Sequence, residues 1–290
     1  MRIEDYRGRA IREKLPTETL RELFDSVWIG QRNCFGDNVD YERFADEIYY
    51  CPETEDYLYN SPPPKPRYER GTRPILEEVV GRVTAGLTTD RERALALLTY
   101  SSRVKERSGN RDYFYGGTEE ELIKKGEKYC ERVSRLFVSL LEIADIPART
   151  VHHLVGGHMT TEVYIESGWA YMDPRHALLY VDKNDRILSV KELIANPEII
   201  LDQPSWVEEI AYNEFPFEKR QKMNCYCFFA KGEIQLYAEY HLSDAHRYHF
   251  EWMPSSEAFS VPERDNYYRE VYAPLRRRAL AEIGASYTDF

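Results

Sequence analysis

The sequence predicts an α+β fold, with helices first and hairpin-connected strands after them. Residues 129–145 carry apolar side chains at helical spacing. Three short strand-like runs follow directly, separated by the turn-forming pairs Gly156-Gly157 and Ser167-Gly168. Helical runs followed by antiparallel hairpins are typical of this fold class.

Two further helices are expected before this long helix, within residues 73–105, with a break at Gly86. Thr89 and Glu92 have the spacing of a capping box, in which each side chain accepts a hydrogen bond from the backbone N–H of the other. They predict the start of the second helix. Residues 106–120 are rich in glycine and polar residues and are expected to form a loop.

After the long helix, alternation and turn signals predict several strands. The first three occupy residues 149–155, 158–165 and 169–173. Another hairpin is expected within residues 178–190, with a short helix at 191–195. Residues 196–224 have no clear period and are expected to be irregular, and residues 226–240 are expected to form a last hairpin.

The chain is expected to divide into three segments. Residues 1–66 form a helical and irregular N-terminal extension that ends in the proline-rich linker 61–66, where neither a helix nor a central strand can form. Residues 67–205 form the core. Residues 206–290 form a C-terminal hairpin and helix that pack on this core.

Composition limits the partners of the chain. Its formal net charge of -11 argues against a nucleic-acid partner and weakly favours neutral or cationic substrates. The sequence shows neither an apolar leader nor a run of roughly 18 apolar residues, so we expect a cytoplasmic protein with no membrane partner. The five cysteines are odd in number and scattered, which favours reduced thiols over a disulfide framework.

Cys130 and His158 are the first two candidate catalytic residues. Cys130 lies near the N-terminus of the long helix, where free N–H groups and the helix dipole favour the reactive thiolate. His158 follows a Gly-Gly turn and opens a strand, so its imidazole can point across to a neighbouring helix end. Imidazole is the usual base for a thiol nucleophile.

Asp173 is the candidate orienting acid, because it ends the strand that folds back on the His158 strand. An ideal two-residue turn at Ser167-Gly168 would place Asp173 opposite Glu162, four positions from His158. Direct contact between Asp173 and His158 therefore requires another turn centre or a bulge. Glu162 is the alternative orienting acid.

Other histidines suggest less specific roles. His152 is expected to share the sheet face of His158, in a structural or substrate-contact role. A zinc site is conceivable from the later histidines and cysteines, but their spacing matches no strong ligand pattern, so we expect no metal. These residues are Cys225, Cys227, His241, His246 and His249. No glycine-rich phosphate loop occurs, and no cofactor is expected.

Four pieces of sequence, taken in order, resemble the transglutaminase-like superfamily over roughly residues 73–195. They are Cys130 opening a helix, Ile146-Pro147-Ala148-Arg149, the His-Met-Thr-Thr-Glu-Val-Tyr run from His158, and Trp169-Ala170-Tyr171-Met172-Asp173-Pro174. The resemblance implies a papain-like core, in which a helix bearing the nucleophile packs on an antiparallel sheet. It also implies that Cys130, His158 and Asp173 act as nucleophile, base and orienting acid.

The same resemblance implies an activity. We expect a thiol-dependent amide hydrolase or acyl transferase that acts on a peptide, protein or amide substrate through an acyl-enzyme. The alternative is a binding or scaffolding module that keeps the fold without turnover. The rate at which Cys130 is alkylated distinguishes the two.

Overall fold

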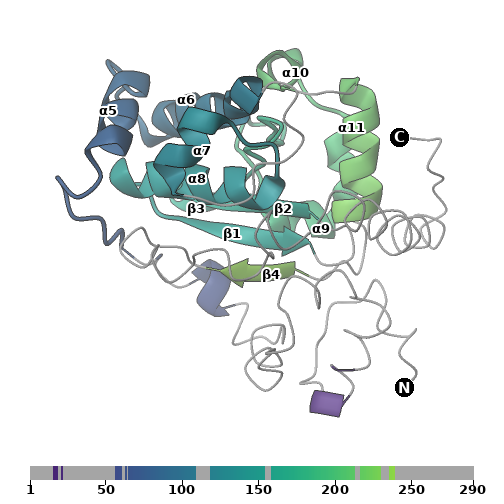
Figure 1. Ribbon diagram of the computed structural model, residues 1–290. Coiled ribbons are helices and arrows are strands. Elements are labelled where there is room, and N and C mark those ends of the chain that lie inside the picture. Colours follow the sequence, from purple (N-terminus) through teal and green to yellow (C-terminus); the bar gives the residue numbers. More distant parts are fainter. Residues whose placement is uncertain are drawn as a thin grey trace, which may run out of the picture.

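The computed structural model describes residues 16–18, 21, 56–60, 63, 65–108, 118–153, 158–212, 216–229 and 235–238 (Figure 1). Within this part of the chain, helices pack on a four-stranded antiparallel sheet with the strand order β3-β2-β1-β4. The predicted α+β class agrees with this arrangement.

The helices that precede the sheet are α5 (Pro74–Val83), α6 (Asp90–Arg103), η3 (Val104–Ser108), α7 (Glu119–Lys125) and α8 (Cys130–Ile143). The break between α5 and α6 is confirmed, and so is the capping box of Thr89 and Glu92. The loop expected at residues 106–120 is partly wrong. The 3-10 turn η3 reaches into it, and α7 begins within it behind a second capping box formed by Thr118 and Glu121.

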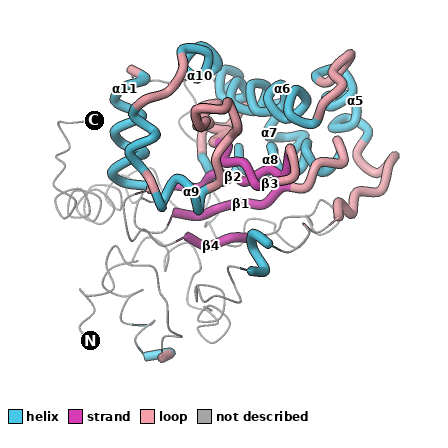
Figure 2. The backbone as a smooth tube through the Cα atoms, turned by 180° about the vertical axis from the view of Figure 1, so that it is seen from behind, coloured by secondary structure: helices cyan, strands magenta, loops and turns pink. Residues whose placement is uncertain are grey.

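Helix α8 lies against the sheet, with α5 and α6 on its outer side (Figures 1 and 2). Its apolar residues are fully buried in a core shared with α5, α6 and strands β2 and β3. The members from α8 include Leu136, Phe137, Leu140 and Leu141, and those from the strands include Val163 and Met172. The helix that begins at Cys130 is therefore fixed to the sheet by burial along its length.

The strands are β1 (Ala148–His153), β2 (His158–Ile165), β3 (Gly168–Met172) and β4 (Gln235–Ala238). The first three lie close to their predicted positions. The turn between β2 and β3 differs from the prediction by one residue. Ile165 pairs with Gly168, so Glu166 and Ser167 form the turn, with φ angles of 52° and 64°. Positive φ at both central residues is what a tight two-residue hairpin requires.

A second core covers the opposite face of the sheet. It contains Val151, Tyr171, Tyr180, Phe228 and Phe229. Tyr171 and Tyr180 stack with ring centroids 5.7 Å apart, and Phe229 meets both rings edge-on. Apart from Val151 and Tyr171, the members of this second core follow β3 in sequence.

These following residues form α9 (Val190–Ala195), η4 (Pro197–Leu201), α10 (Ser205–Ile210), α11 (Phe217–Met223) and the π-helical turn η5 (Asn224–Phe228). The expectation that residues 196–224 are irregular is therefore wrong. The first strand of the hairpin expected at residues 226–240 is also wrong, because η5 occupies its start. A short apolar run does not distinguish a buried strand from a buried helical turn. Its second strand is present as β4, which pairs with β1.

A buried ion pair between Arg149 and Glu162 lies on the face of the sheet that the second core covers. It contacts the short π-helical turn η2 (Asp56–Asn60). Arg149 on β1 contacts Glu162 on β2 with an Nη2–Oε2 distance of 2.6 Å, and its guanidinium stacks over Trp169 at 3.8 Å. Its Nη1 donates to the carbonyl oxygen of Leu58 at 2.7 Å, while Tyr59 donates its hydroxyl to Glu162 at 3.0 Å. The pair thus holds η2 in place.

Much of the predicted extensions lies outside the described residues, including 1–15, 22–55 and 239–290. The segment boundaries at residues 66 and 205 stay predictions. The later histidines of the conceivable zinc site, His241, His246 and His249, also lie outside. Among the helices that the structure describes, none has the length and apolar character needed to cross a membrane.

Candidate active site

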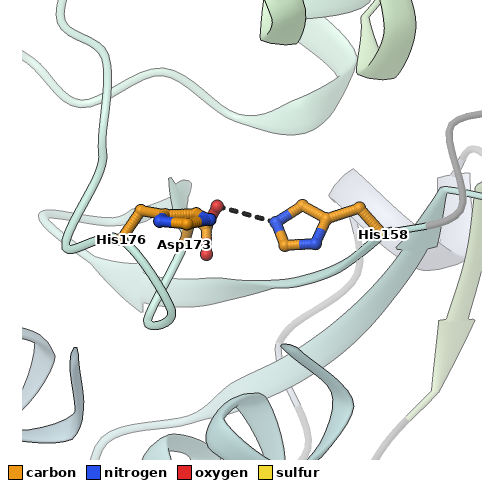
Figure 3. A group of neighbouring side chains, drawn as sticks. All are labelled: His158, Asp173 and His176. Carbon is orange, nitrogen blue, oxygen red and sulfur yellow. Dashed lines mark hydrogen bonds and ion pairs between the residues drawn. The ribbon is translucent and has the colours of Figure 1, made fainter. Parts of the chain in front are cut away.

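His158 and Asp173 form a buried pair at one end of the sheet. The Nε2 atom of His158 lies 2.7 Å from Oδ2 of Asp173 (Figure 3). The position of the turn allows this contact. Met172 pairs with Thr161, so the next residue, Asp173, comes two positions closer to His158 than a turn at Ser167-Gly168 would place it. The requirement for another turn centre is met.

Glu162, the alternative orienting acid, is engaged elsewhere. Arg149 binds its Oε2, and the backbone N–H of Val190 donates to its Oε1 at 2.7 Å. In β3, Tyr171 rather than Asp173 lies opposite Glu162. The structure therefore places Asp173, and not Glu162, against the imidazole of His158.

Asp173 is held by a tight loop that follows β3. Its backbone N–H donates to the carbonyl of Leu178 at 2.7 Å, and its Oδ1 accepts from the backbone N–H of Arg175 at 3.0 Å. Burial would raise the pKa of Asp173, but the charge and hydrogen bond of His158 and the neighbouring positive charges together outweigh this effect and hold the pKa well below its usual range. Asp173 is thus a carboxylate with both oxygens engaged.

Cys130 is the first residue of α8 and is partly exposed. The first turn of α8 is tied to the beginning of β2, because the Ser134 hydroxyl donates to the carbonyl of Met159 at 3.2 Å. Burial would raise the pKa of Cys130, but the charge and hydrogen bond of His158, the charge of Arg175 and the backbone of Met159 lower it below its ordinary value. The neighbours that act on the thiol therefore include His158, the candidate base, and their combined effect favours the thiolate.

The imidazole of His158 responds in the opposite direction. Burial would lower its pKa, but the negative charges of Asp173 and Cys130 outweigh burial and raise the pKa to about 9. Because Nε2 faces Asp173, Nδ1 is the ring nitrogen left for the thiol. A lowered pKa on the thiol and a raised pKa on the imidazole together favour a thiolate–imidazolium ion pair at neutral pH.

A second histidine supports the first. His153 pairs directly with His158 across β1 and β2, so His153, and not His152 as expected, shares the face of His158. Its Nδ1 lies 3.0 Å from the carbonyl oxygen of Phe228 and its Nε2 lies 2.9 Å from the Thr160 hydroxyl. Since a carbonyl only accepts, Nδ1 carries the proton and Nε2 accepts from Thr160. Burial lowers the pKa of His153 to about 3, which keeps it neutral.

The ring of Phe228 packs on His158, with centroids 4.8 Å apart. Phe228 belongs to η5, and the hydrogen bond from His153 to its carbonyl holds that turn against the sheet. The imidazole of His158 is thereby shielded from water on one side, which strengthens its interaction with Asp173. Nothing in the sequence around Phe228 indicates this role, because 70 residues separate it from His158.

His176 also adjoins the pair, beside Asp173 in Figure 3. The ligand atoms of His158, Asp173 and His176 all lie within 4.8 Å of one another, and two imidazoles with a carboxylate form a donor set that transition metals accept. Burial lowers the pKa of His176 well below its ordinary value, so it is neutral. In this structure, His158 and Asp173 use the facing atoms of this cluster for the hydrogen bond to each other, so these two atoms are not open to an ion. Cys225, from the conceivable zinc set, lies in η5 and is buried.

Three elements carry the candidate residues in chain order: a helix that begins with Cys130, a strand that begins with His158, and a strand that leads into Asp173. Residues 77–174 match the family model of the transglutaminase-like superfamily. The resemblance expected from the sequence is thereby confirmed for this segment. The transglutaminase-like segment runs from within α5 to the residue after Asp173, so it contains all three candidate residues. The superfamily includes cysteine-dependent enzymes, and some of its members are inactive.

Searches of curated proteins and of solved structures found no match to the chain.

Two neighbours of the site were not singled out from the sequence. Arg175 and His176 follow Asp173-Pro174 within the loop that returns to Leu178. A proline after a strand end signals a tight turn, and the side chains of such a turn lie next to the residue that ends the strand. That signal points to the loop, but not to the direction of its side chains.

Proposed function

We propose that this protein is a thiol-dependent amide hydrolase or acyl transferase, with Cys130 as nucleophile, His158 as base and Asp173 as orienting acid. The observation that carries the proposal is the shared imidazole. His158 donates from Nε2 to Asp173 at 2.7 Å, while its charge lowers the pKa of the Cys130 thiol. The match of residues 77–174 to a superfamily with cysteine-dependent members supports it.

In the proposed reaction, the Cys130 thiolate attacks the carbonyl carbon of an amide. The imidazolium of His158 gives its proton to the leaving amine, and an acyl-enzyme remains. Water activated by His158 then releases an acid, or a second amine accepts the acyl group. Throughout, Asp173 keeps Nδ1 of His158 directed at the thiol. The backbone N–H of Cys130, at the free end of α8, is the candidate donor to the oxyanion.

Peptides, proteins or smaller amides are the proposed substrates, and the proposed location is the cytoplasm. Both Cys130 and Cys225 are free thiols, which is the usual state in a reducing compartment. A cofactor has no part in the proposed steps, because the thiol and the imidazole supply the nucleophile and the proton transfers.

Alkylation tests the proposal. Iodoacetamide should modify Cys130 rapidly at pH values below neutrality, and much more slowly in a His158→Ala variant. Cys225 provides a control within the same molecule. It is buried, and burial raises its pKa to about 11, so it should react slowly in both proteins. Peptide mapping by mass spectrometry separates the two thiols.

Slow labelling of Cys130 that His158→Ala leaves unchanged would contradict the proposal. It would favour the rival, a transglutaminase-like module that binds partners without turnover. A second experiment addresses the acyl-enzyme directly. Incubation with a library of peptides and glutamine amides, followed by mass spectrometry of the intact protein, should capture an adduct on Cys130 and none on the Cys130→Ala variant.

A further inference from the structure

Arg175 differs from most other partly buried arginines in the part of the chain that the structure describes. Those arginines lie against carboxylates, as Arg73, Arg91 and Arg93 do. Arg175 is also partly buried, but its guanidinium forms no ion pair with any described residue. In a chain with a net charge of -11, this arginine without an acid lies two residues from Asp173, and its backbone binds the carboxylate that holds the candidate base.

The loop that carries Arg175 fixes its backbone beside Asp173. Asp173 and Leu178 exchange two backbone hydrogen bonds, 2.7 and 3.1 Å long, and the backbone N–H of Arg175 occupies Oδ1 of Asp173. The other oxygen of Asp173 belongs to His158. Both oxygens of the Asp173 carboxylate are therefore already engaged by N–H groups. The charge of Arg175 acts on Cys130 instead, where it contributes to the lowered pKa of the thiol.

We propose that Arg175 binds a carboxylate of the substrate, next to the amide that Cys130 attacks. This inference rests on the proposed function and adds a substrate class to it: amides that carry a carboxylate near the scissile carbonyl. The local positive charge at the nucleophile thus opposes the preference for neutral or cationic substrates that the net charge alone suggests.

Arginine suits this task. Its planar guanidinium offers paired N–H donors that match a carboxylate, and it is less strongly hydrated than an ammonium group. The partly buried position weakens the screening by water, so that a substrate carboxylate gains more there than it would on an open surface. A role in lowering the pKa of Cys130 is the simpler alternative, and it would need no anionic substrate.

Two alkylating reagents separate these roles, because iodoacetate is anionic and iodoacetamide is neutral. The fraction of Cys130 present as thiolate affects both rates equally and cancels in their ratio. In the wild-type protein, Cys130 should react faster with iodoacetate than with iodoacetamide. In Arg175→Gln, the ratio of the iodoacetate rate to the iodoacetamide rate should fall roughly three- to tenfold. Arg175→Lys should keep most of the preference, since the charge remains.

Arg186→Gln is the matched control, because it removes one arginine that is already paired with Glu192, at 2.6 Å. Its ratio should equal that of the wild type. An unchanged ratio in Arg175→Gln, with fast iodoacetamide labelling retained, would overturn the assignment of Arg175 and leave the proposed function standing. Slow labelling of wild-type Cys130 by both reagents, unaffected by His158→Ala, would instead overturn the proposed function.

A substrate-like pair extends the test to acyl transfer. The p-nitrophenyl esters of succinate and of butyrate differ at the far end of the acyl chain, where the succinate ester carries a carboxylate. The wild-type protein should release p-nitrophenol from the succinate ester with the higher kcat/KM, mainly through a lower KM. Arg175→Gln should remove this difference, so that the ratio of the two kcat/KM values falls towards one whatever the change in the thiol itself. Equal kcat/KM values for the two esters in the wild type would count against a carboxylate site.

Discussion

The imidazole of His158 donates to the carboxylate of Asp173 across 2.7 Å, and both side chains are nearly inaccessible to solvent. The charge of each group sets the pKa of the other. Asp173, together with Cys130, raises the pKa of His158 to about 9, and His158 lowers the pKa of Asp173. The pair therefore stores a proton next to Cys130 at neutral pH.

Replacing Asp173 with Asn should reduce both reactivity and stability. Without the carboxylate, the pKa of His158 falls and the Cys130 thiol loses its cationic neighbour, so the alkylation profile should move to higher pH. Loss of a charge-assisted hydrogen bond should lower the free energy of unfolding by about 2 kcal/mol. Stopped-flow alkylation across pH and urea denaturation measure the two effects. Glu218→Gln, which changes a carboxylate in an exposed pair with Lys222, should show neither.

Cys130 and His158 should affect the pH dependence of stability in opposite directions. His158 has its pKa raised from 6.5 to about 9, so its contribution is complete below pH 6.5 and is lost as the pH rises through 9. The pKa of Cys130 is lowered, so its contribution is present at high pH and is lost as the pH falls. In the wild type, the changes in the free energy of unfolding with pH that the two groups cause therefore offset each other.

Cys130→Ser removes the thiol's contribution while Asp173 still raises the pKa of His158. This variant should therefore lose stability more steeply than the wild type between pH 6.5 and pH 9. Urea unfolding of both proteins across that interval measures the slopes. Parallel slopes would show that the proton on His158 is not linked to the charge of the thiol.

The buried pair of Arg149 and Glu162 should be costly to break. Arg149→Ala leaves the carboxylate of Glu162 without its charge partner inside the protein, which typically costs about 3 kcal/mol or more. It should also release η2, because Arg149 binds the carbonyl of Leu58. Arg186→Ala removes a half-exposed pair and should change the free energy of unfolding by less than about 1 kcal/mol. Similar losses in the two variants, measured by urea denaturation, would contradict this ranking.

His153 should act as a neutral support for the site. His153→Leu removes hydrogen bonds to the Phe228 carbonyl and the Thr160 hydroxyl, and leaving these groups unpaired should cost about 2 kcal/mol. Because its pKa is about 3, the ring of His153 should show no titration in NMR spectra between pH 5 and pH 8, the interval in which an ordinary histidine changes charge. A resonance of His153 that shifts within this interval would show that the ring is more accessible than the structure has it.

The sequence was sufficient for the framework of the site. Apolar period predicted α8, alternation predicted β2, and the Thr89–Glu92 spacing predicted the start of α6. These features depend on neighbours in the chain, which sequence patterns record directly. The candidate residues Cys130 and His158 were placed by the same local signals.

The details that align the site depend on contacts between distant residues. The turn at Glu166 and Ser167 uses two non-glycine residues with positive φ, whereas the sequence favoured a turn that included Gly168. Phe228 reaches His158 from a helical turn that its apolar neighbours made resemble a strand. The position of Arg175 beside Asp173 follows from a loop closed by backbone hydrogen bonds, which no residue pattern encodes.

The hairpin between β2 and β3 makes the chemistry sensitive to chain length. Side chains alternate between the two faces of a strand, so one residue added to or removed from Glu166-Ser167 would slip β3 by one place and turn Asp173 away from His158. Replacement of Ser167 by Gly or Asn, residues that accept positive φ readily, leaves this count unchanged. Variation in the kind of residue should therefore be tolerated at this turn, and variation in their number should not.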